Sequence, residues 1–373
     1  MGGTELAYIH NAFEENWVAP LGPHVNAFEE QMALYCQSPY AVALSSGTAA
    51  IHLGLIALGV NKNDLVICQS KTFSASANPI IYQGATPVFI DSEIQTWNMC
   101  PNALEGALEQ LSVDGMLAQV KAILVVHLYG MPANLKAILD IANKYGIPVL
   151  EDAAEALGST YYGQPCGSFG KIGVLSFNGN KIITTSGGGA LLTSESDIAS
   201  STVHLSTQAR DPAPHYEHSK IGYNYRLSNI CAGIGLGQME VLPERIAQRR
   251  ANFERYRQYF STLNQKGYSI KFQEEDTNSF SNRWLTCILI DPKENKGITR
   301  EDVRLKLLED NIEARPLWKP MHLQPVFQSC LYFGNKVSET LFQHGLCLPS
   351  GSLLSNEEFA RIFRKLDEVF LGE

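Results

Sequence analysis

From about residue 41 to residue 195, short apolar runs alternate with segments of helical periodicity, and this alternation constrains the fold more than any other feature. Most of the runs are apolar at successive positions, which is typical of strands buried on both faces of a parallel sheet. Expected strands lie at residues 41–44, 64–68, 87–90, 122–126 and 147–150. Expected helices lie at residues 48–58, 75–82 and 135–146, the last ending at Gly146.

The pattern changes near Gly233, where a long charged helical segment runs over residues 243–263. A strand pattern at 284–290 and a helical one at 300–309 then favour a smaller α+β domain. The expected fold class is therefore α/β, with a mainly parallel sheet covered by helices in a large domain at residues 25–249. The small C-terminal domain is expected at 250–373. An N-terminal arm, residues 1–24, is expected to join the small domain or to cross to a partner subunit.

Charge and composition exclude several classes of partner. The chain has 29 Lys and Arg against 38 Asp and Glu, a net charge of −9, which disfavours nucleic acid and anionic membranes but allows a small anionic substrate. No apolar run approaches the roughly 20 residues of a membrane helix, and the start does not resemble a secretory signal. The eight cysteines are scattered without a Cys-x-x-Cys pair, which favours reduced thiols in the cytoplasm.

The segment Ser-Ser-Gly-Thr-Ala-Ala at residues 45–50 follows an expected strand and opens a helix. Small residues let an anion approach the backbone, and free N–H groups at a helix N-terminus favour a phosphate. An ordinary capped turn explains the same residues.

Asp152 ends an expected buried strand, at the edge where open α/β sheets bind their ligands. A carboxylate there is costly to bury unless a cation or hydrogen-bond donor meets it. Helix capping by Asp152, with Glu155 three residues later, is the alternative.

Lys181 lies between two apolar runs and close to three consecutive glycines. A partly desolvated lysine has a lowered pKa and can form a Schiff base, whereas an isolated lysine in such a hairpin would be expected at the surface. Together, a phosphate-binding turn, a strand-end Asp and a loop Lys are the parts that pyridoxal phosphate needs.

These segments resemble the DegT/DnrJ/EryC1/StrS sugar aminotransferases, which belong to the fold-type-I (aspartate aminotransferase-like) pyridoxal phosphate enzymes. The resemblance covers nearly the whole chain. It is carried by PLG at residues 20–22, SSGTAAIHL at 45–53, EDAAEALG at 151–158, SFNGNKIITT at 176–185 and GYNYRLSN at 222–229.

A narrower resemblance, to the bacterial aminotransferases that make UDP-4-amino-4,6-dideoxy-N-acetylglucosamine for bacillosamine, is carried by residues 178–189, 206–210, 215–218, 315–322 and 348–351. It implies transfer of an amino group from L-glutamate to C4 of UDP-4-keto-6-deoxy-N-acetylglucosamine.

The resemblance also implies roles for single residues. Lys181 is the Schiff-base and proton-transfer lysine, and Asp152 pairs with the pyridine nitrogen of the cofactor. The phosphate is bound by the backbone N–H groups of Gly47 and Thr48 and by the Ser176 hydroxyl. Asn224 of the partner subunit reaches the same phosphate, so the active unit is expected to be a homodimer.

Two further cofactor contacts are expected from the resemblance. Phe73 stacks on the cofactor ring, although a core position would also suit this aromatic residue. Glu155 lies near the phenolic oxygen of the cofactor, where many members of the family have Gln, so its protonation state is open.

The substrate contacts are expected from residues that could meet a sugar diphosphate. The cations considered are Arg210, Lys220, Arg226, Arg315 and Lys319, of which Arg226, Arg315 and Lys319 are kept as candidates. Trp318 and His322 are expected to line the sugar pocket, with packing at a domain boundary as the alternative. His215 and His218 are three residues apart, but no further Cys/His pair completes a metal site, so no metal is expected.

Other functions remain as alternatives. The nucleotide could be dTDP or GDP, and the new C4 amine could have the opposite configuration. A dinucleotide-dependent oxidoreductase would need a Gly-x-Gly-x-x-Gly turn, which the chain lacks. A non-catalytic regulator on the same fold is possible in principle, but such a protein would not need Lys181, Asp152 and Ser176 together.

Overall fold

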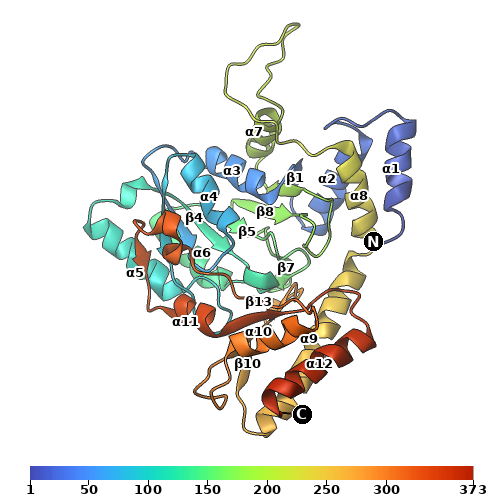
Figure 1. Ribbon diagram of the computed structural model, residues 1–373. Coiled ribbons are helices and arrows are strands. Elements are labelled where there is room, and N and C mark those ends of the chain that lie inside the picture. The colour runs from blue at the N-terminus through green and yellow to red at the C-terminus, as the bar shows by residue number, and fades with distance from the viewer. Residues whose placement is uncertain (373) are drawn as a thin grey trace.

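An eight-stranded sheet organises the larger part of the computed structural model, which describes residues 1–372 (Figure 1). The strand order is β1-β9-β8-β5-β4-β2-β3-β14, and among these strands β9 alone runs against the others. The predicted mainly parallel α/β sheet is therefore confirmed. The strands are β1 (Tyr40–Leu44), β9 (Gly189–Thr193), β8 (Ile172–Ser176), β5 (Val149–Asp152), β4 (Val120–Val126), β2 (Leu65–Gln69), β3 (Thr86–Ile90) and β14 (Tyr332–Phe333).

Helices cover both faces of this sheet because successive strand residues point to opposite sides. In β2, Val66 packs with the cluster that holds α3, α4 and α7, whereas Ile67 packs with the cluster that holds α5 and α6. A third cluster, nearer β1 and β9, holds α2 and α8. These helices are α2 (Pro23–Tyr35), α3 (Gly47–Ala57), α4 (Ser74–Tyr82), α5 (Pro101–Val113), α6 (Leu135–Tyr145), α7 (Ser196–Ser206) and α8 (Asn229–Glu240).

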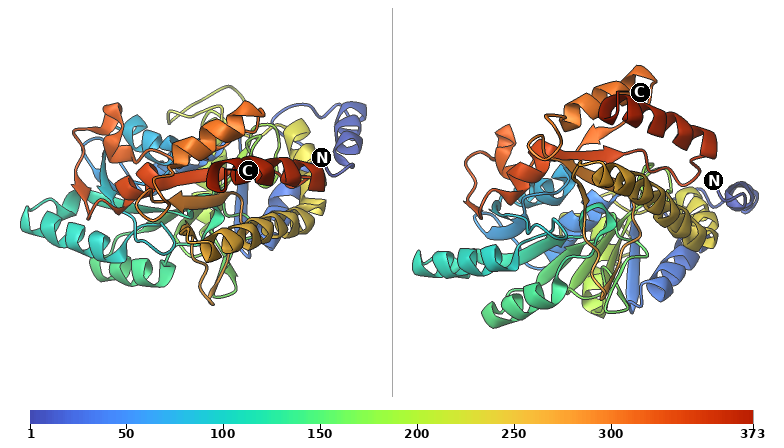
Figure 2. Two further views of the ribbon diagram at one scale, coloured as in Figure 1. Left: turned by 60° about the horizontal axis from the view of Figure 1, so that its bottom comes forward. Right: turned by 90° about the horizontal axis from the view of Figure 1, so that it is seen from below.

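A four-stranded antiparallel sheet lies in the lower part of the molecule in Figure 1 and faces the viewer in Figure 2. Its order is β10 (Ile270–Phe272), β12 (Thr286–Ile290), β15 (Gly345–Leu348) and β13 (Arg315–Pro316). Its core is shared with α9 (Leu242–Gln265), α10 (Arg300–Glu309) and α12 (Asn356–Phe370). The structure thus has the strand and the helices expected at 284–290, 243–263 and 300–309.

The remaining elements are short or lie at the margins. They are α1 (Glu5–Glu14), α11 (Val337–His344), a small sheet of β6 (Thr160–Tyr161), β7 (Gln164–Pro165) and β11 (Ser279–Phe280), and 3-10 turns at Leu117–Gln119, Leu128–Gly130, Met321–Leu323 and Pro325–Phe327. Helix α1 packs on α8. No described helix combines the length and the apolar character needed to cross a membrane.

Local sequence signals set several helix ends. Asn134 caps α6 by accepting from the Ala137 N–H, and Gly146 ends it in the left-handed conformation, with φ of 66°. Thr299 and Asp302 form a capping box at the start of α10. By contrast, β14 was not among the expected strands, because it is two residues long and pairs with β3 far earlier in the chain.

A close approach of β9 to the start of α3 places the helix N-terminus at the edge of the sheet. Gly189 lies between β1 and β8, and a Cβ on it would stand 2.4 Å from the Gly47 nitrogen. A Cβ on Gly47 would in turn stand 3.0 Å from that of Ser176. Glycine at 189 therefore lets α3 begin directly beside the end of β8.

Replacing Gly189 by Ala should destabilise the protein, because the new methyl group meets backbone atoms that cannot rotate away. We expect a loss of about 1–3 kcal/mol in the free energy of unfolding, measured by denaturant titration. Gly106→Ala is the matched control: Gly106 is exposed in α5, and a methyl group added to it would have nothing within 4 Å. That change should stabilise the helix by up to about 1 kcal/mol. Equal effects of the two substitutions would contradict the close-packing argument.

Candidate active site

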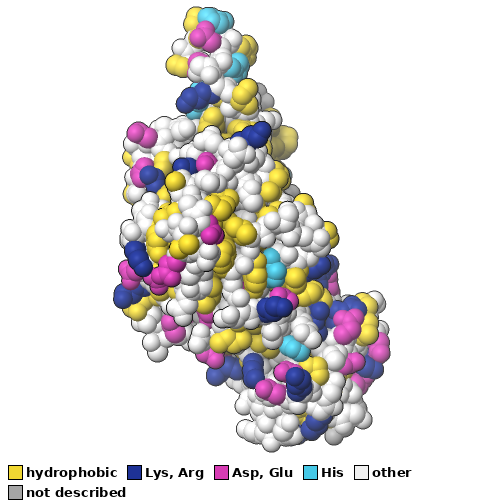
Figure 3. Space-filling model, turned by 90° about the vertical axis from the view of Figure 1, so that its left-hand side faces the viewer, with side chains coloured by type: hydrophobic (Ala, Val, Ile, Leu, Met, Phe, Trp, Pro, Cys, Tyr) yellow, Lys and Arg dark blue, Asp and Glu magenta, His cyan; other side chains and the backbone are white. Residues whose placement is uncertain are grey.

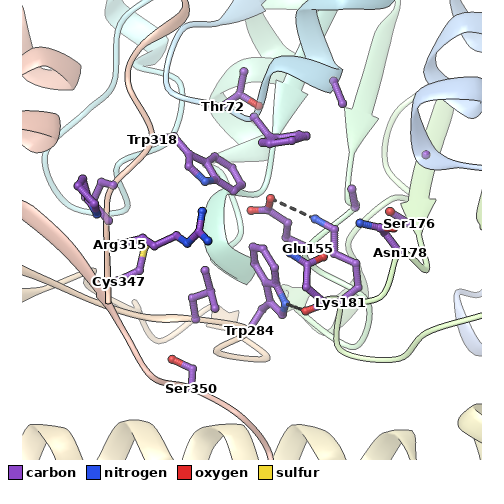
Figure 4. A pocket seen from close by; sticks show the side chains of 18 of the residues that line it. Thr72, Glu155, Ser176, Asn178, Lys181, Trp284, Arg315, Trp318, Cys347 and Ser350 are labelled. Atoms are coloured by element: carbon purple, nitrogen blue, oxygen red, sulfur yellow. Dashed lines mark hydrogen bonds and ion pairs between the residues drawn. The ribbon is translucent and has the colours of Figure 1, made fainter. Parts of the chain in front are cut away.

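A cavity of about 1540 Å³ lies where the carboxyl ends of the parallel strands face the four-stranded sheet. Side chains from both sheets line it, and the view in Figure 4 shows them converging on one space. Open α/β sheets bind ligands at this edge. The sequence-predicted residues that line the cavity are Gly47, Thr48, Phe73, Asp152, Glu155, Ser176, Lys181, Arg315, Trp318 and Lys319.

The N-terminus of α3 opens into this cavity. Ser46 caps the helix, its hydroxyl accepting from the Ala49 N–H at 3.0 Å. Among the described residues, no hydrogen-bond acceptor is found for the N–H groups of Gly47 and Thr48. With the Ser176 side chain at the end of β8 lining the same cavity, these donors suit a phosphate.

Asp152 ends β5 and is 5% exposed. One carboxylate oxygen accepts from the Ser76 hydroxyl at 2.6 Å, and the other accepts from the Ala154 N–H at 3.1 Å. Ser76 itself, in α4, is 2.6 Å from the Thr72 hydroxyl. These contacts fix the carboxylate at the cavity wall without pairing it with a cation of the described chain.

Lys181 and Glu155 form the charged centre of the cavity (Figure 4). The Lys181 Nζ lies 3.4 Å from the Glu155 Oε1 and 4.3 Å from the centroid of the Trp284 ring. The Lys181 side chain is 11% exposed and that of Glu155 is 4% exposed. The second oxygen of Glu155 accepts from the Tyr129 N–H at 2.7 Å.

Burial dominates the proton affinity of Glu155. Desolvation raises the pKa of this carboxyl to about 7, although the Lys181 charge and the Tyr129 N–H act in the opposite direction. Asp152 adds a smaller upward contribution, since two negative charges in one site repel each other. Glu155 can therefore hold or release a proton near neutral pH.

Aromatic rings also line the cavity, among them those of Phe73 and Trp318. Phe73 is 53% exposed, and its ring centroid lies 5.4 Å from that of Trp318. The exposed ring of Phe73 is open to stack on a planar ligand. Arg315 and Lys319 bring positive charge to the same cavity, and Arg315 also pairs with Glu313.

Three sequence-predicted site residues lie outside the lining of this cavity. The Arg226 guanidinium is occupied by Glu29 and by the Ala43 carbonyl, the latter at 3.0 Å. His322 lies behind the wall, with Nδ1 2.7 Å from the Ser70 hydroxyl and its ring stacked on Tyr332.

Asn224 is the third of these residues, and it is exposed on the segment between α7 and α8. Its side-chain oxygen accepts from Gln208 at 3.1 Å. The segment projects from the body of the molecule, and its tip carries His, acidic and apolar side chains (Figures 1 and 3). In the same segment, the His215 Nε2 lies 2.8 Å from the Glu217 Oε2, and the described residues form no metal-binding cluster.

Several cavity residues were not predicted from the sequence. Ser76 sits near the start of α4, and its position after a strand that ends at the same edge was a usable signal. Trp284 was interpreted only as part of a strand pattern, yet its ring faces Lys181. Other cavity-lining residues that were not predicted as site residues include Asn178, Leu285, Phe342, Cys347 and Ser350.

The residues present fit pyridoxal phosphate. Two backbone N–H groups at a helix N-terminus suit its phosphate, a buried carboxylate suits its ring nitrogen, and a lysine suits its aldehyde. All of these groups line the same cavity.

Comparisons with known proteins point the same way. The model of the DegT/DnrJ/EryC1/StrS aminotransferase family matches residues 1–367. EpsN of Bacillus subtilis (strain 168), named as a proposed pyridoxal phosphate-dependent aminotransferase, is 50% identical over 99% of this chain and 94% of its own length. The GDP-perosamine synthase of Escherichia coli O157:H7 is 35% identical over 99% of this chain and 96% of its own.

The fold comparison is equally extensive. The crystal structure of a DegT DnrJ EryC1 StrS aminotransferase from Brucella abortus matches with a TM-score of 0.90 at 27% identity, covering 98% of this chain and 95% of that one. This likeness confirms the fold-type-I architecture that the sequence resemblance implied.

The raised pKa of Glu155 predicts a pH-dependent stability of the apoprotein. Folded Glu155 binds its proton more tightly than the unfolded chain does, so its stabilising contribution is complete below its ordinary pKa of 4.5 and is lost as pH rises to about 7. Glu155→Gln should remove this loss. Stability from denaturant titrations between pH 5 and pH 8 should therefore fall less steeply with pH in the variant than in the wild type.

The control for this experiment is Glu30→Gln, because Glu30 is exposed on α2. It should leave the pH dependence of stability unchanged. A Glu155→Gln profile parallel to that of the wild type would mean that the carboxyl titrates normally.

Proposed function

The chain belongs to the DegT/DnrJ/EryC1/StrS aminotransferase family and is a pyridoxal phosphate-dependent enzyme, and from this premise we propose that it makes a 4-amino sugar. The amino group would come from L-glutamate, and the acceptor would be C4 of UDP-4-keto-6-deoxy-N-acetylglucosamine. The observation that supports the proposal most directly is the convergence of Lys181, Asp152 and the N-terminus of α3 on one cavity.

Pyridoxal phosphate, when bound, supplies an electron sink that makes a proton next to the amino nitrogen removable. Lys181 would bind the cofactor and then move that proton as general acid and base, a role that its position in the partly desolvated cavity suits. Asp152 would keep the ring nitrogen protonated, because its carboxylate is held in place by Ser76 and is not used by a cation of the described chain.

The phosphate would be bound by the N–H groups of Gly47 and Thr48 and by the Ser176 hydroxyl. Phe73 would stack on the cofactor ring, and Glu155 would lie beside the ring's phenolic oxygen. Glu155 suits that place because it can carry a proton near neutral pH and so avoid placing a second negative charge beside an oxyanion.

We propose a homodimer with Asn224 acting in the partner's site. Asn224 is exposed, pairs with Thr207 just after α7 and does not line the cavity of its own chain. A residue in that position can contribute to a phosphate site only if a second subunit brings the segment to it.

The sugar end of the substrate would meet Trp318, Arg315 and Lys319. These three line the cavity and offer an aromatic face and two cations to a sugar diphosphate. The cavity volume of about 1540 Å³ exceeds the several hundred Å³ typical of a single small ligand, so it has room for cofactor and nucleotide sugar together.

A GDP-linked 4-keto-6-deoxy sugar is the second candidate substrate. The observation that favours it is the 35% identity with a GDP-perosamine synthase over 99% of this chain. A dTDP-linked sugar and the opposite configuration at C4 are further outcomes that a substrate panel resolves.

Absorbance spectroscopy tests the binding of the cofactor and the role of Lys181. Protein loaded with pyridoxal phosphate should show a visible absorbance band that is lost on adding L-glutamate. Lys181→Ala should slow this loss by at least about 10³-fold, because the proton-transfer group is removed. Lys171→Ala is the control, since Lys171 is a surface lysine paired with Glu195. A glutamate response in Lys181→Ala at the wild-type rate would refute the assignment of Lys181.

The glutamate-treated protein then tests the acceptor. Adding UDP-, GDP- and dTDP-linked 4-keto-6-deoxy sugars separately should restore the visible band, fastest with the UDP-linked N-acetylated sugar. Nuclear magnetic resonance of the product gives the C4 configuration. If the visible band recovered faster with the GDP-linked sugar, that sugar would be the substrate and the UDP-linked one would not.

Subunit complementation tests the role of Asn224. Asn224→Asp should place a negative charge against the phosphate, so that this variant and Lys181→Ala are each nearly inactive alone. Refolding the two chains together should restore about a quarter of wild-type activity, because half the dimers are mixed and each has one intact site. If Asn224 acted within its own chain, the mixture would stay inactive.

A further inference from the structure

Trp318 is held at both of its backbone polar groups by buried side chains. Its N–H donates to the Tyr129 hydroxyl at 3.0 Å, and its carbonyl accepts from the Lys71 Nζ at 2.8 Å. Tyr129 follows β4 and Lys71 follows β2, both in the eight-stranded sheet, whereas Trp318 follows β13 of the four-stranded sheet. The two side chains therefore fix a cavity residue from the opposite side of the cavity.

Lys71 is an unusual residue to find at this place. It is 0% exposed, and no carboxylate of the described chain pairs with it. Burial lowers the pKa of Lys71 to about 7. A buried amine with one carbonyl partner is costly, and its neighbours Trp318, Phe342 and Cys347 are all residues that line the cavity.

Tyr129 is equally constrained. It is 1% exposed and adopts the left-handed conformation, with φ of 57° and ψ of 22°. A bulky residue in this conformation is strained and persists only where its surroundings hold it. Its N–H bonds to Glu155 and its hydroxyl to Trp318, so one strained residue contacts both sides of the site.

The ring of Trp318 is the centre of an aromatic cluster. Its centroid lies 4.9 Å from that of Tyr129, 5.4 Å from that of Phe73 and 6.3 Å from that of Trp284. Phe73 and Trp284 both line the cavity, and Trp284 lies against Lys181. A small movement of Trp318 would therefore change its spacing from Phe73 and from Trp284, which lies against Lys181.

Ser70 holds the residues that follow Trp318, because it bonds to Met321 and contacts His322. Its carbonyl accepts from the Met321 N–H at 2.8 Å, and its hydroxyl lies 2.7 Å from the His322 Nδ1. This explains why His322 lies behind the cavity wall. The segment 317–322 is thus fastened to the eight-stranded sheet at several points.

We propose that Lys71 and Tyr129 are positioning residues that set Trp318 against the sugar substrate and so determine the affinity for it. The proposal rests on the proposed function, because it takes the nucleotide sugar as the ligand that contacts Trp318. Neither residue lines the cavity, so both act through Trp318 and not by touching the substrate.

Steady-state kinetics of the holoenzyme test the proposal with Lys71→Met and Tyr129→Phe. Each removes one polar partner of Trp318 and preserves most of the side-chain volume. We expect KM for the nucleotide sugar to rise about 10-fold, while kcat and KM for L-glutamate change less than about 3-fold, since binding is lost equally in ground and transition states. Equal changes in both KM values would overturn the proposal.

Two control variants separate positioning from a general loss of stability. Tyr268→Phe removes a hydroxyl that donates to the Phe370 carbonyl, and Lys365→Met removes a partly buried amine paired with Glu368. Neither residue lines the cavity. They should leave KM for the sugar unchanged even where they lower the unfolding temperature.

A second measurement needs no substrate. Amide hydrogen exchange of the holoenzyme should show the Trp318 N–H exchanging at least about 10-fold faster in Tyr129→Phe and in Lys71→Met than in the wild type. An unchanged exchange rate of the Trp318 N–H would refute the positioning role of Lys71 and Tyr129, whichever sugar the enzyme uses. Failure of every sugar in the panel, with faster exchange in both variants, would refute only the proposed substrate.

Discussion

The burial of two carboxylates three positions apart, Asp152 and Glu155, is the constraint on which the site depends. Both are about 5% exposed, and among the described residues Lys181 is the one cation found in contact with either of them. Burying two such charges is unfavourable unless donors and cations surround them. The chain supplies Ser76, the Tyr129 N–H and Lys181, and it leaves Asp152 facing the cavity without a counter-charge from the described residues. A ligand with a cationic ring nitrogen would supply the missing positive charge, which is the role proposed for the cofactor.

The second constraint is that the cavity has walls from two sheets. The strand ends β5 and β8 and the start of α3 form one wall, whereas Arg315, Trp318 and Lys319 come from the chain after β13 begins. The two walls keep their spacing because the backbone of segment 317–322 is bonded to Ser70, Lys71 and Tyr129. The proposed cofactor and substrate subsites are thereby joined by hydrogen bonds as well as by apolar packing.

The residues that could be predicted from sequence are those whose signals are local. Strands β1 to β5 and helix α10 follow from periodicity. Asp152 stands out because it ends a buried strand, and Lys181 stands out because it lies between two apolar runs. The rest depends on tertiary contacts. Nothing near Arg226 reveals that Glu29 occupies its guanidinium, nothing near His322 reveals Ser70, and a lysine such as Lys71 would be expected at the surface. The two-residue strand β14 is too short to have a period at all.

Tyr129 links the electrostatic constraint to the geometric one. Its N–H donates to Glu155, whose pKa of about 7 lies near physiological pH, and its hydroxyl accepts from the Trp318 N–H. A carboxylate accepts a hydrogen bond more strongly than the neutral acid does. The protonation of Glu155 therefore alters the bond that helps to hold Tyr129 in its strained conformation. Through this one residue, the charge of Glu155 and the position of Trp318 are linked.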